Sequence, residues 1–471
     1  MAKTASAVPG RLSTPAMLAF AVGNIPAALL TVLLSTYVPR FYAGHIGVGM
    51  AVIGGAIATV RLVDVGLDLL IGWSMDRTRT RLGRYRVWYV AALPVLAVAT
   101  FMLLNPPEDA GASYLMVWLF ILYAGLSTVI LSHSAWAAAM ATDYHERSRI
   151  YGWIHVIAAA GAITLLAMPA ITGGAIKPGE ASSMPALAWI VILALPLTGG
   201  VTLFTTRERV APTQSQDISW RGLGQLIARP DIVRLILADL FLALGPGLTQ
   251  PIFIFFFHNA KGYSVAQASL LLIPLIAGQM IGAPIWPQIA RRMTKHRALQ
   301  LATVAYGLSQ ATVVLLPPGV FPAVLIGNFV VGLCSASFYV LVRAMIADAG
   351  DEIRLDTGQE RTGMLYALIV MTQKIGGSIS VSIVFPILAV IGYNPKDGAV
   401  NTPEALRGLE LCYLIPPLVL VLLAACMFFG YRLDETRHAE VRALLDERDA
   451  LAASDAPGSP APAPSAAASA G

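Results

Sequence analysis

The stretch Val60–Trp88, VRLVDVGLDLLIGWSMDRTRTRLGRYRVW, decides the fold that this sequence predicts. Its first half is typical of an apolar membrane helix, yet it contains Arg61, Asp64 and Asp68. Three charges at the centre of a membrane helix cost about 9 kcal/mol, at about 3 kcal/mol each. The Val, Ile and Leu residues of 52–71 return only about 5 kcal/mol. The charged side chains must therefore face other protein or water, inside a bundle of helices.

The spacing of these charges predicts a small site. Asp64 and Asp68 are four residues apart, so they share one face of a helix, and Arg61 lies three residues before Asp64 on the same stripe. Two carboxylates and one guanidinium sum to about −1, which one small cation or one proton would neutralise. The alternative is a buried salt-bridge cluster that only holds helices together.

The composition indicates a polytopic all-α membrane protein. The chain has 471 residues, of which 56% are hydrophobic and only 13% are charged, whereas soluble domains have about 25% charged residues. This length suits about a dozen spans of about 20 residues each. The net charge of +5 does not indicate nucleic-acid binding, because the arginines cluster in short loops. The three cysteines lie in apolar runs without metal spacing, so no cofactor is expected.

The apolar runs predict twelve spans in two sets of six. They fall at about 14–39, 48–75, 87–105, 113–142, 150–172, 184–206, 231–257, 265–290, 297–316, 320–347, 363–392 and 408–431. The first run has no cleavage site and is expected to be a retained helix. The predicted organisation is an N-terminal half 1–206, a cytoplasmic linker 207–230, a C-terminal half 231–432 and a partly disordered cytoplasmic tail 433–471.

Basic residues predict the orientation. The loop after the second run contains Arg77, Arg79, Arg81, Arg84 and Arg86, and the loop after the eighth contains Arg291, Arg292, Lys295 and Arg297. The loops NPPEDAGA (105–112) and LPPGVFP (316–322) contain no basic residue. Both termini are therefore expected to be cytoplasmic in the inner (plasma) membrane. Two six-helix halves joined by a polar loop fit the parallel repeats of the major facilitator architecture, around a central cavity.

Several motifs at matching topology resemble one family. They are RLVDVGLD (61–68), GWSMDRTR (72–79) with Gly83 and Arg84, TDYHER (142–147), Ala347, Asp348 and Asp351 with Thr357, Gly358, Arg361 and Gly363, and Lys374 before Gly376 and Gly377. Together they resemble the melibiose-permease-like glycoside–pentoside–hexuronide:cation symporters of the major facilitator superfamily.

The resemblance implies roles for five residues. Asp64 and Asp68 would bind the coupling cation, and Ser127 falls at the position of the family's hydroxyl ligand in the fourth helix. Lys374 would couple the cation to the substrate, and we place Arg61 with it. The coupling ion in this family is sodium, lithium or a proton, and the fold usually works as a monomer in the lipid bilayer.

The sequence also departs from the family pattern. The sugar-binding aspartate of the first helix aligns with Ile25, the aspartate of the fourth helix aligns near Ile130, and the sugar-binding arginine of the fifth helix falls near His155. The cation half of the site is thus kept while the galactoside-binding half is largely gone. The substrate class stays open between a sugar, glycoside or uronide and a lipid-like or drug-like amphiphile.

Sugar sites need convergent hydrogen-bonding groups and an aromatic platform. The candidates for substrate binding are Asn24, His133, Trp136, His155 and Gln373. Trp136 offers a stacking face, and His155 replaces a substrate-binding arginine that could meet an anionic substrate when protonated. Each could instead pack in the core or bond the backbone. Gln250 and Gln279 are further polar groups within apolar runs that could line a cavity or bond a neighbouring helix.

A gate at the cytoplasmic end is predicted from the loop charges. Its members are Asp76, Arg77, Arg84, Asp143 and Arg147. A charge network that breaks and reforms between two halves is what alternating access requires. The alternative is that the arginines set orientation only. Within the seventh run, Arg234 and Asp239 are expected to form a local pair, with membership of a gate as the alternative.

The favoured function is cation-coupled symport of a small organic solute, with proton-coupled transport of an amphiphile as the alternative. A non-transporting membrane sensor or scaffold is a third hypothesis, against which the retained cation motif argues. The sequence has no phosphate-binding loop, no metal-ligand cluster and no nucleophile motif, so we expect neither a pump driven by ATP nor an enzyme.

Overall fold

The computed structural model describes most of the chain: residues 13–140, 144–178, 180–206, 229–358, 362–396 and 398–431, with a few positions between 437 and 448. All regular secondary structure in these ranges is helical. Within them, 12 helices are long and apolar enough to cross a membrane. The predicted all-α fold with twelve transmembrane helices is therefore confirmed.

Six spans precede the central gap at 207–228. They are α1 (Thr14–Val22) continued by α2 (Ile25–Val32), η1 (Leu33–Tyr37), α3 (Val38–Phe41) and η2 (Tyr42–Ile46); α4 (Met50–Arg77); α5 (Arg86–Leu104); α6 (Ala112–Met140); α7 (Tyr144–Leu166) followed by α8 (Met168–Ile171); and η3 (Ala181–Ser183) with α9 (Met184–Thr205).

Six spans follow the gap. They are α11 (Pro230–Thr249) with α12 (Phe253–Phe255) and η4 (Phe256–Ala260); α13 (Val265–Leu270) with α14 (Leu272–Met293); α15 (Lys295–Leu315); α16 (Phe321–Thr357); α17 (Thr362–Val390); and α18 (Pro403–Cys426).

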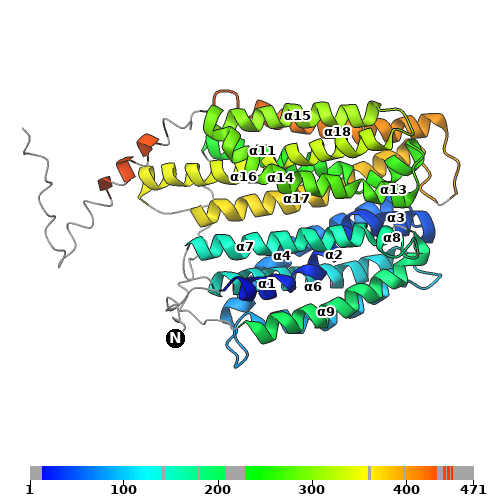
Figure 1. Cartoon of the computed structure of the whole chain (residues 1–471), viewed down its shortest axis with the longest axis horizontal. Coiled ribbons are helices and arrows are strands. Elements are labelled where there is room, and N and C mark those ends of the chain that lie inside the picture. The colour runs from blue at the N-terminus through cyan, green and yellow to red at the C-terminus, as the bar shows by residue number, and fades with distance from the viewer. Residues whose placement is uncertain are drawn as a thin grey trace, which may run out of the picture.

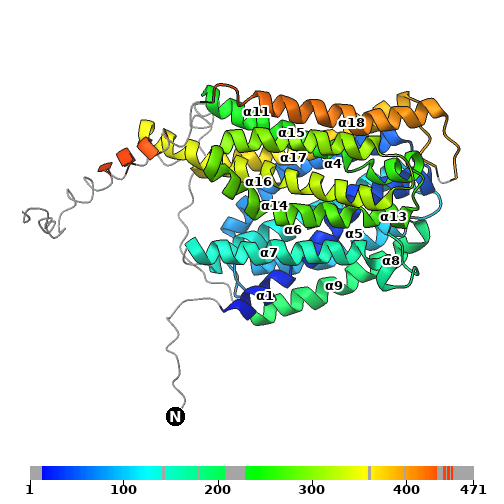
Figure 2. The same ribbon diagram turned by 45° about the horizontal axis from the view of Figure 1, so that its top comes forward.

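The helices form two groups, which Figures 1 and 2 show on opposite sides of the molecule: α1 to α9 in one and α11 to α18 in the other. The groups meet mainly where α4 packs against α17, with a further contact between α7 and α14. The predicted linker, 207–230, falls almost entirely outside the described residues, as does most of the predicted tail. The domain boundaries therefore stay a prediction.

Hydrogen bonds join the two groups at the end of the bundle opposite Thr14. Gln250 Nε2 donates to Ser35 Oγ at 3.1 Å, and Ser269 Oγ donates to the carbonyl of Pro178 at 3.3 Å. Both bonds connect a segment of the first group to a segment of the second. They hold the two groups together at the end where α3, α8 and α13 lie (Figure 1).

The first span is broken at Gly23. Pro26 lacks the N–H group that would continue the helical ladder at the start of α2. Side chains from neighbouring helices bond carbonyls beside the break, one of which, that of Phe20, also accepts from Gly23 N. Tyr89 Oη of α5 donates to the Gly23 carbonyl at 2.8 Å, and His133 Nε2 of α6 lies 3.0 Å from the Phe20 carbonyl. The break is therefore fixed from outside the span.

The tenth span extends further than its apolar pattern predicted. The pattern ends at about residue 347, but α16 continues to Thr357 and stops where Gly358 adopts a left-handed conformation with φ 70°. Lys295 Nζ bonds both oxygens of Asp348 at 2.8 and 2.6 Å, which supports the polar extension. The segment after 347 that the sequence placed in a loop is thus largely helical, because polar residues continue a helix beyond the apolar layer.

Glycines allow α14 and α16 to pack with their backbones in contact. A Cβ atom at Gly332 would lie 2.0 Å from the Leu275 carbonyl oxygen, and one at Gly278 would lie 2.1 Å from that of Phe329. No side-chain rearrangement relieves a clash with backbone. Small residues at helix interfaces are the usual device for close approach in membranes.

We expect Gly332→Ala to lower the thermal stability of the purified protein. Overpacking a close interface costs about 1–3 kcal/mol, and here the clashing atoms belong to backbone. Gly72→Ala in α4 is the matched control, because a Cβ there has no neighbour within 4 Å. The measurement is the midpoint of thermal unfolding in detergent for both variants. A midpoint for Gly332→Ala equal to that of Gly72→Ala would contradict the packing argument.

Candidate cation site and substrate cavity

The acids of α4 lie against α6 and α17. Ser127 Oγ of α6 donates to Asp64 Oδ1 at 2.8 Å. Lys374 Nζ of α17 donates to Asp64 Oδ2 at 3.4 Å, and it also bonds Asp68 Oδ2. The Asp64 residue is only 6% exposed. Both carboxylates therefore face protein rather than the outer surface, and each group of helices contributes to the cluster.

Arg61 lies one turn from Asp64 and is held by α6. Its Nε donates to Tyr123 Oη at 3.0 Å, and its guanidinium lies 5.2 Å from the centre of the Tyr123 ring. A Cβ atom at Gly377 would lie 2.8 Å from Arg61 Nη1, so a side chain there would displace the Arg61 guanidinium. The absence of a side chain at Gly377 leaves room for the Arg61 guanidinium against α17.

The cluster is electrically balanced once Lys374 is counted. Asp64 and Asp68 contribute −2 and Arg61 and Lys374 contribute +2, so the formal charges cancel. The sequence-based sum of −1 left Lys374 out. A cation that entered this site would therefore have to displace the Lys374 ammonium from at least one carboxylate, or leave an uncompensated charge in a site of low dielectric constant.

One carboxylate oxygen of the cluster has no hydrogen-bond partner among the described residues. This oxygen is Asp68 Oδ1, which is buried. Oxygen ligands from carboxylates and hydroxyls suit hard cations. Asp64, Asp68 and Ser127 together offer such oxygens within one cluster, and a proton on either carboxylate is the simpler alternative. The arrangement can thus exchange the lysine ammonium for a small cation or a proton.

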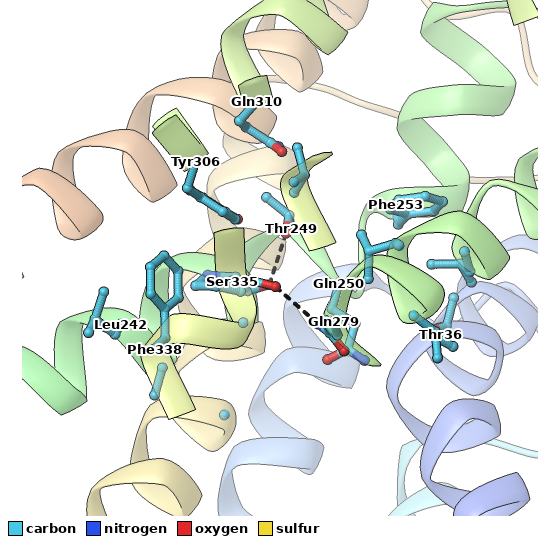
Figure 3. Close-up of a pocket in the computed structure, with 18 of the residues that line it drawn as sticks. Thr36, Leu242, Thr249, Gln250, Phe253, Gln279, Tyr306, Gln310, Ser335 and Phe338 are labelled. Carbon is cyan, nitrogen blue, oxygen red and sulfur yellow. Dashed lines mark hydrogen bonds between the residues drawn. The ribbon is translucent and has the colours of Figure 1, made fainter. Parts of the chain in front are cut away.

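A cavity of about 390 Å³ lies between the two groups of helices. Figure 3 shows its polar side chains converging, with Gln279 Nε2 of α14 donating to Ser335 Oγ of α16 at 3.2 Å. The polar and aromatic side chains that line it are Thr36, Thr249, Gln250, Gln279, Gln310, Ser335, Gln373, Tyr306, Tyr339, Tyr413, Phe253 and Phe338. None of the described residues that line this cavity has a formally charged side chain.

The cavity and the cation cluster share one stretch of α17. Gln373 and Gly377 line the cavity, and Lys374 lies between them in the sequence. A movement of this turn of α17 would therefore change both the cation cluster and the cavity wall. Of the predicted substrate residues, Gln373 is the one that lines this cavity.

A second cavity of about 500 Å³ adjoins the first and shares Gln279, Ser335 and Tyr339 with it. His155 of α7 lines its other side, so this cavity also lies between the two groups. His155 Nδ1 lies 3.1 Å from the carbonyl of Tyr151, which fixes the ring against its own helix. The structure thus places His155 where a solute between the groups could reach it.

The other predicted substrate residues lie elsewhere. His133 is buried, stacks on Phe20 with ring centres 4.1 Å apart, and helps to fix the break in the first span. Trp136 is fully buried in the same cluster. Asn24 precedes α2 without capping it through its side chain. None of the three lines either cavity, so we leave them out of the proposed substrate site.

The predicted gate is only partly described. The Arg77 guanidinium lies 3.6 Å from the centre of the Trp73 ring, and Arg84 Nε donates to the Met75 carbonyl at 3.2 Å. The side chains of Asp76 and Arg147, and the whole of Asp143, lie outside the described residues. The gate therefore stays a prediction.

The expected local pair between Arg234 and Asp239 is wrong. Asp239 Oδ1 accepts from Gln373 Nε2 at 2.8 Å, on α17. Arg234 Nη1 instead lies 3.9 Å from Asp231, nearer the start of α11. The two residues are five positions apart, so they point to different faces of the helix.

Sequence reasoning missed part of the cavity. Ser335, Tyr339 and Gln310 were not among the candidates, although Gln310 gives the same signal as Gln250 and Gln279, a glutamine within an apolar run. Four of the five predicted substrate residues, Asn24, His133, Trp136 and His155, lie in the first half of the chain. The polar side chains of the cavity come mainly from α11 to α18.

Two bundles of helices around a cavity lined by both polar and apolar side chains, with a buried ion cluster between them, define a secondary transporter of the major facilitator class. The chain belongs to the MFS/sugar transport protein family, which it matches over residues 19–435.

Known proteins of similar sequence and fold support this assignment. The glucuronide carrier protein homolog of Escherichia coli K12 is 22% identical over 93% of this chain and 96% of its own length. The sodium-dependent lysophosphatidylcholine symporter 1 of Xenopus tropicalis is 22% identical over 92% of this chain and 90% of its own. The nucleoside transporter NupG (D323A mutant) has a similar fold, with a TM-score of 0.68 at 14% identity, over 88% of this chain and 100% of its own.

Proposed function

We propose that this protein is a cation-coupled symporter of a neutral, hydroxyl-rich solute such as a glycoside, working by alternating access. The observation that supports it most is the turn of α17 at 373–377. In this turn Lys374 bonds both acids of α4, while Gln373 and Gly377 line the central cavity. Because one rigid segment contacts both sites, occupancy of either changes the free energy of the other.

The lining of the central cavity favours a neutral sugar over a uronide or an amphiphile. Amides and hydroxyls suit the hydroxyl groups of a sugar, and Phe338 and Tyr339 offer apolar faces for its ring. A uronide carboxylate needs a cationic partner when buried; the described lining of the central cavity offers none, and His155 lines only the adjoining cavity. A lysolipid chain would bury apolar carbons against four glutamine side chains as well as against aliphatic side chains such as Leu242, Leu275 and Ile276.

The coupling ion is proposed to bind at Asp64 and Asp68 with help from Ser127. Sodium or a proton would replace the Lys374 ammonium there, and a sodium-dependent relative supports cation coupling of this kind. Arg61 would keep the remaining charge of the cluster low from its place beside Tyr123. A loaded site and a lysine-paired site would then favour different arrangements of the two groups.

The orientation and the working unit are part of the proposal. Both termini and the linker 207–230 would face the cytoplasm, with the protein acting as a monomer in the inner membrane. The hydrogen bonds of Gln250 and Ser269 between the groups would then lie at the external end. The proposed gate of Asp76, Arg77, Arg84, Asp143 and Arg147 would close the other end in the alternate state.

Thermal-shift measurements on purified protein test the substrate class. The probes are methyl β-glucoside, methyl β-xyloside, methyl β-glucuronide and lysophosphatidylcholine, each with and without sodium and at two pH values. We expect a neutral glycoside to raise the melting temperature, and to raise it more when the coupling cation is present, because both ligands bind the folded state. Comparing how sodium and how pH change the melting temperature with the glycoside present identifies the coupling ion.

The same thermal-shift measurements include the outcomes that would contradict the proposal. Stabilisation by lysophosphatidylcholine alone would replace the sugar with an amphiphile. Stabilisation by the glucuronide alone would show that a cationic group reaches the substrate. A neutral glycoside whose effect is independent of both sodium and pH would remove cation coupling.

A further inference from the structure

Asp239 is a buried acid that the proposed cation site does not use. It lies on α11 and is fully buried, at 0% exposure. Its Oδ1 accepts from Gln373 Nε2 at 2.8 Å, and its Oδ2 lies 2.5 Å from Thr372 Oγ1, both on α17. Both neighbours are neutral. Ionisable residues inside membrane spans are functional candidates by default, because a buried charge is costly there.

Counting protons around Thr372 indicates the form of the acid. Thr372 Oγ1 lies within hydrogen-bond distance of two acceptors, Asp239 Oδ2 at 2.5 Å and the Ile369 carbonyl at 2.7 Å. A hydroxyl has one proton to donate and two lone pairs to accept with. If Asp239 is protonated, its O–H donates to Thr372 Oγ1, and Thr372 donates to the Ile369 carbonyl. Each donor and acceptor in this series, from Asp239 through Thr372 to the Ile369 carbonyl, then has a hydrogen-bond partner.

Asp239 is also connected to the transport machinery. Thr372 and Gln373, which contact it, directly precede Lys374, which bonds the acids of α4. Gln373 additionally lines the central cavity. The three consecutive residues 372–374 of α17 therefore contact two separate acid sites, one in each group of helices.

A charged group also faces Asp239 from α16. Arg343 interacts electrostatically with the carboxyl group, and its guanidinium carbon lies 3.2 Å from the centre of the Tyr339 ring. Tyr339 lines both cavities. An ionised Asp239 would attract Arg343, whereas a protonated one would leave it on the Tyr339 ring. A change in the charge of Asp239 can thus alter two residues of the cavity wall, Gln373 directly and Tyr339 through Arg343.

We propose that Asp239 is a second proton-binding site, separate from Asp64 and Asp68, which takes up and releases a proton as the carrier works. The proton is exchanged with water through the cavity at Gln373. When it binds, it converts the carboxylate to a carboxylic acid that donates to Thr372. When it leaves, the carboxylate accepts from Thr372 and Gln373 and attracts Arg343.

Infrared difference spectroscopy of the full chain in proteoliposomes tests this without knowledge of the solute. The buffer is exchanged between about pH 6 and about pH 9, a range in which exposed carboxyl groups are almost fully ionised. We expect a carboxylic acid C=O band at the acid end that disappears at the alkaline end. The band should be lost in Asp239→Asn and kept in Asp109→Asn, a control in the exposed loop after α5.

Two further variants keep the test decisive if Asp239→Asn does not fold. Asp239→Glu should retain a titrating band at a shifted frequency. Thr372→Val removes one hydrogen-bond partner of the acid and should move the frequency while the band still titrates. A pH difference spectrum that none of the three substitutions changes would overturn the proposal.

The sodium response separates this site from the proposed cation site. Addition of sodium should alter carboxylate bands that depend on Asp64 and Asp68, and these changes should persist in Asp239→Asn. A sodium response without an Asp239 band would leave the symporter proposal standing and remove the second proton site. An Asp239 band without a sodium response would support the second proton site and would exclude sodium as the coupling ion.

Discussion

Replacing Asp68 with asparagine is expected to abolish cation-driven accumulation of the solute while the protein still folds. Asp68 has one oxygen bonded to Lys374 and another that is buried without a partner among the described residues. An amide keeps the shape of the side chain but removes the charge that would attract the ion. Loss of one member of a buried charge pair typically costs 2–5 kcal/mol, which is about a 30-fold or larger loss of ion affinity.

The measurement is uptake into proteoliposomes under an imposed sodium or proton gradient, with the solute that the thermal-shift panel identifies. Asp109→Asn serves as the matched control, because it makes the same chemical change in an exposed loop. Asp64→Asn should behave like Asp68→Asn, while its amide oxygen can still accept the hydrogen bond from Ser127. Full accumulation by the double variant would refute the proposed cation site.

The sequence predicted the architecture well because charge and hydropathy are local properties. Apolar runs gave the number of spans, and charges that lipid cannot tolerate placed Asp64 and Asp68 on a protein-facing side. The end of α16 was missed because a polar helix that continues into water, to Thr357, has no apolar signal. The break at Gly23 was missed because the side chains that bond carbonyls beside it come from helices distant in sequence.

The substrate residues were harder to predict because a cavity depends on which helices meet. His133 and Trp136 had suitable chemistry, but they pack against Phe20 around the broken span. The cavity is instead lined by glutamines from separate helices. The sequence contains no pattern that predicts Gln279 and Gln310 to line the same cavity. The partner of Asp239 was wrong for the same reason, since spacing within α11 says nothing about α17.

The two acid sites together suggest how α17 could work. Its residues 372–374 contact Asp239 in one group of helices and the acids of α4 in the other. A charge change at either site alters the hydrogen bonds of the same turn, which also forms part of the cavity wall. Coupling between ion and solute then needs no long pathway, because one element contacts both sites and both sites bias its position.

Replacing Lys374 with methionine is expected to separate exchange from net transport. In the ion-free carrier, the Lys374 ammonium balances two carboxylates, which would otherwise leave a charge of −1 with Arg61. A buried cluster with an uncompensated charge resists the rearrangement that returns the empty carrier. With the ion bound, the cluster is balanced without lysine, so the loaded carrier should still cross.

We therefore expect Lys374→Met to retain solute counterflow in the presence of the coupling ion while gradient-driven accumulation falls about tenfold or more. Ion affinity should rise about tenfold, or about 1.4 kcal/mol, because a tethered competitor has been removed. Counterflow and accumulation are measured in the same proteoliposomes. Ion affinity is measured by titration of the purified protein. Lys374→Arg keeps the charge and should preserve net transport. If Lys374→Met accumulated solute as well as the parent protein, or bound the ion more weakly, then Lys374 would not act as the internal substitute for the coupling cation.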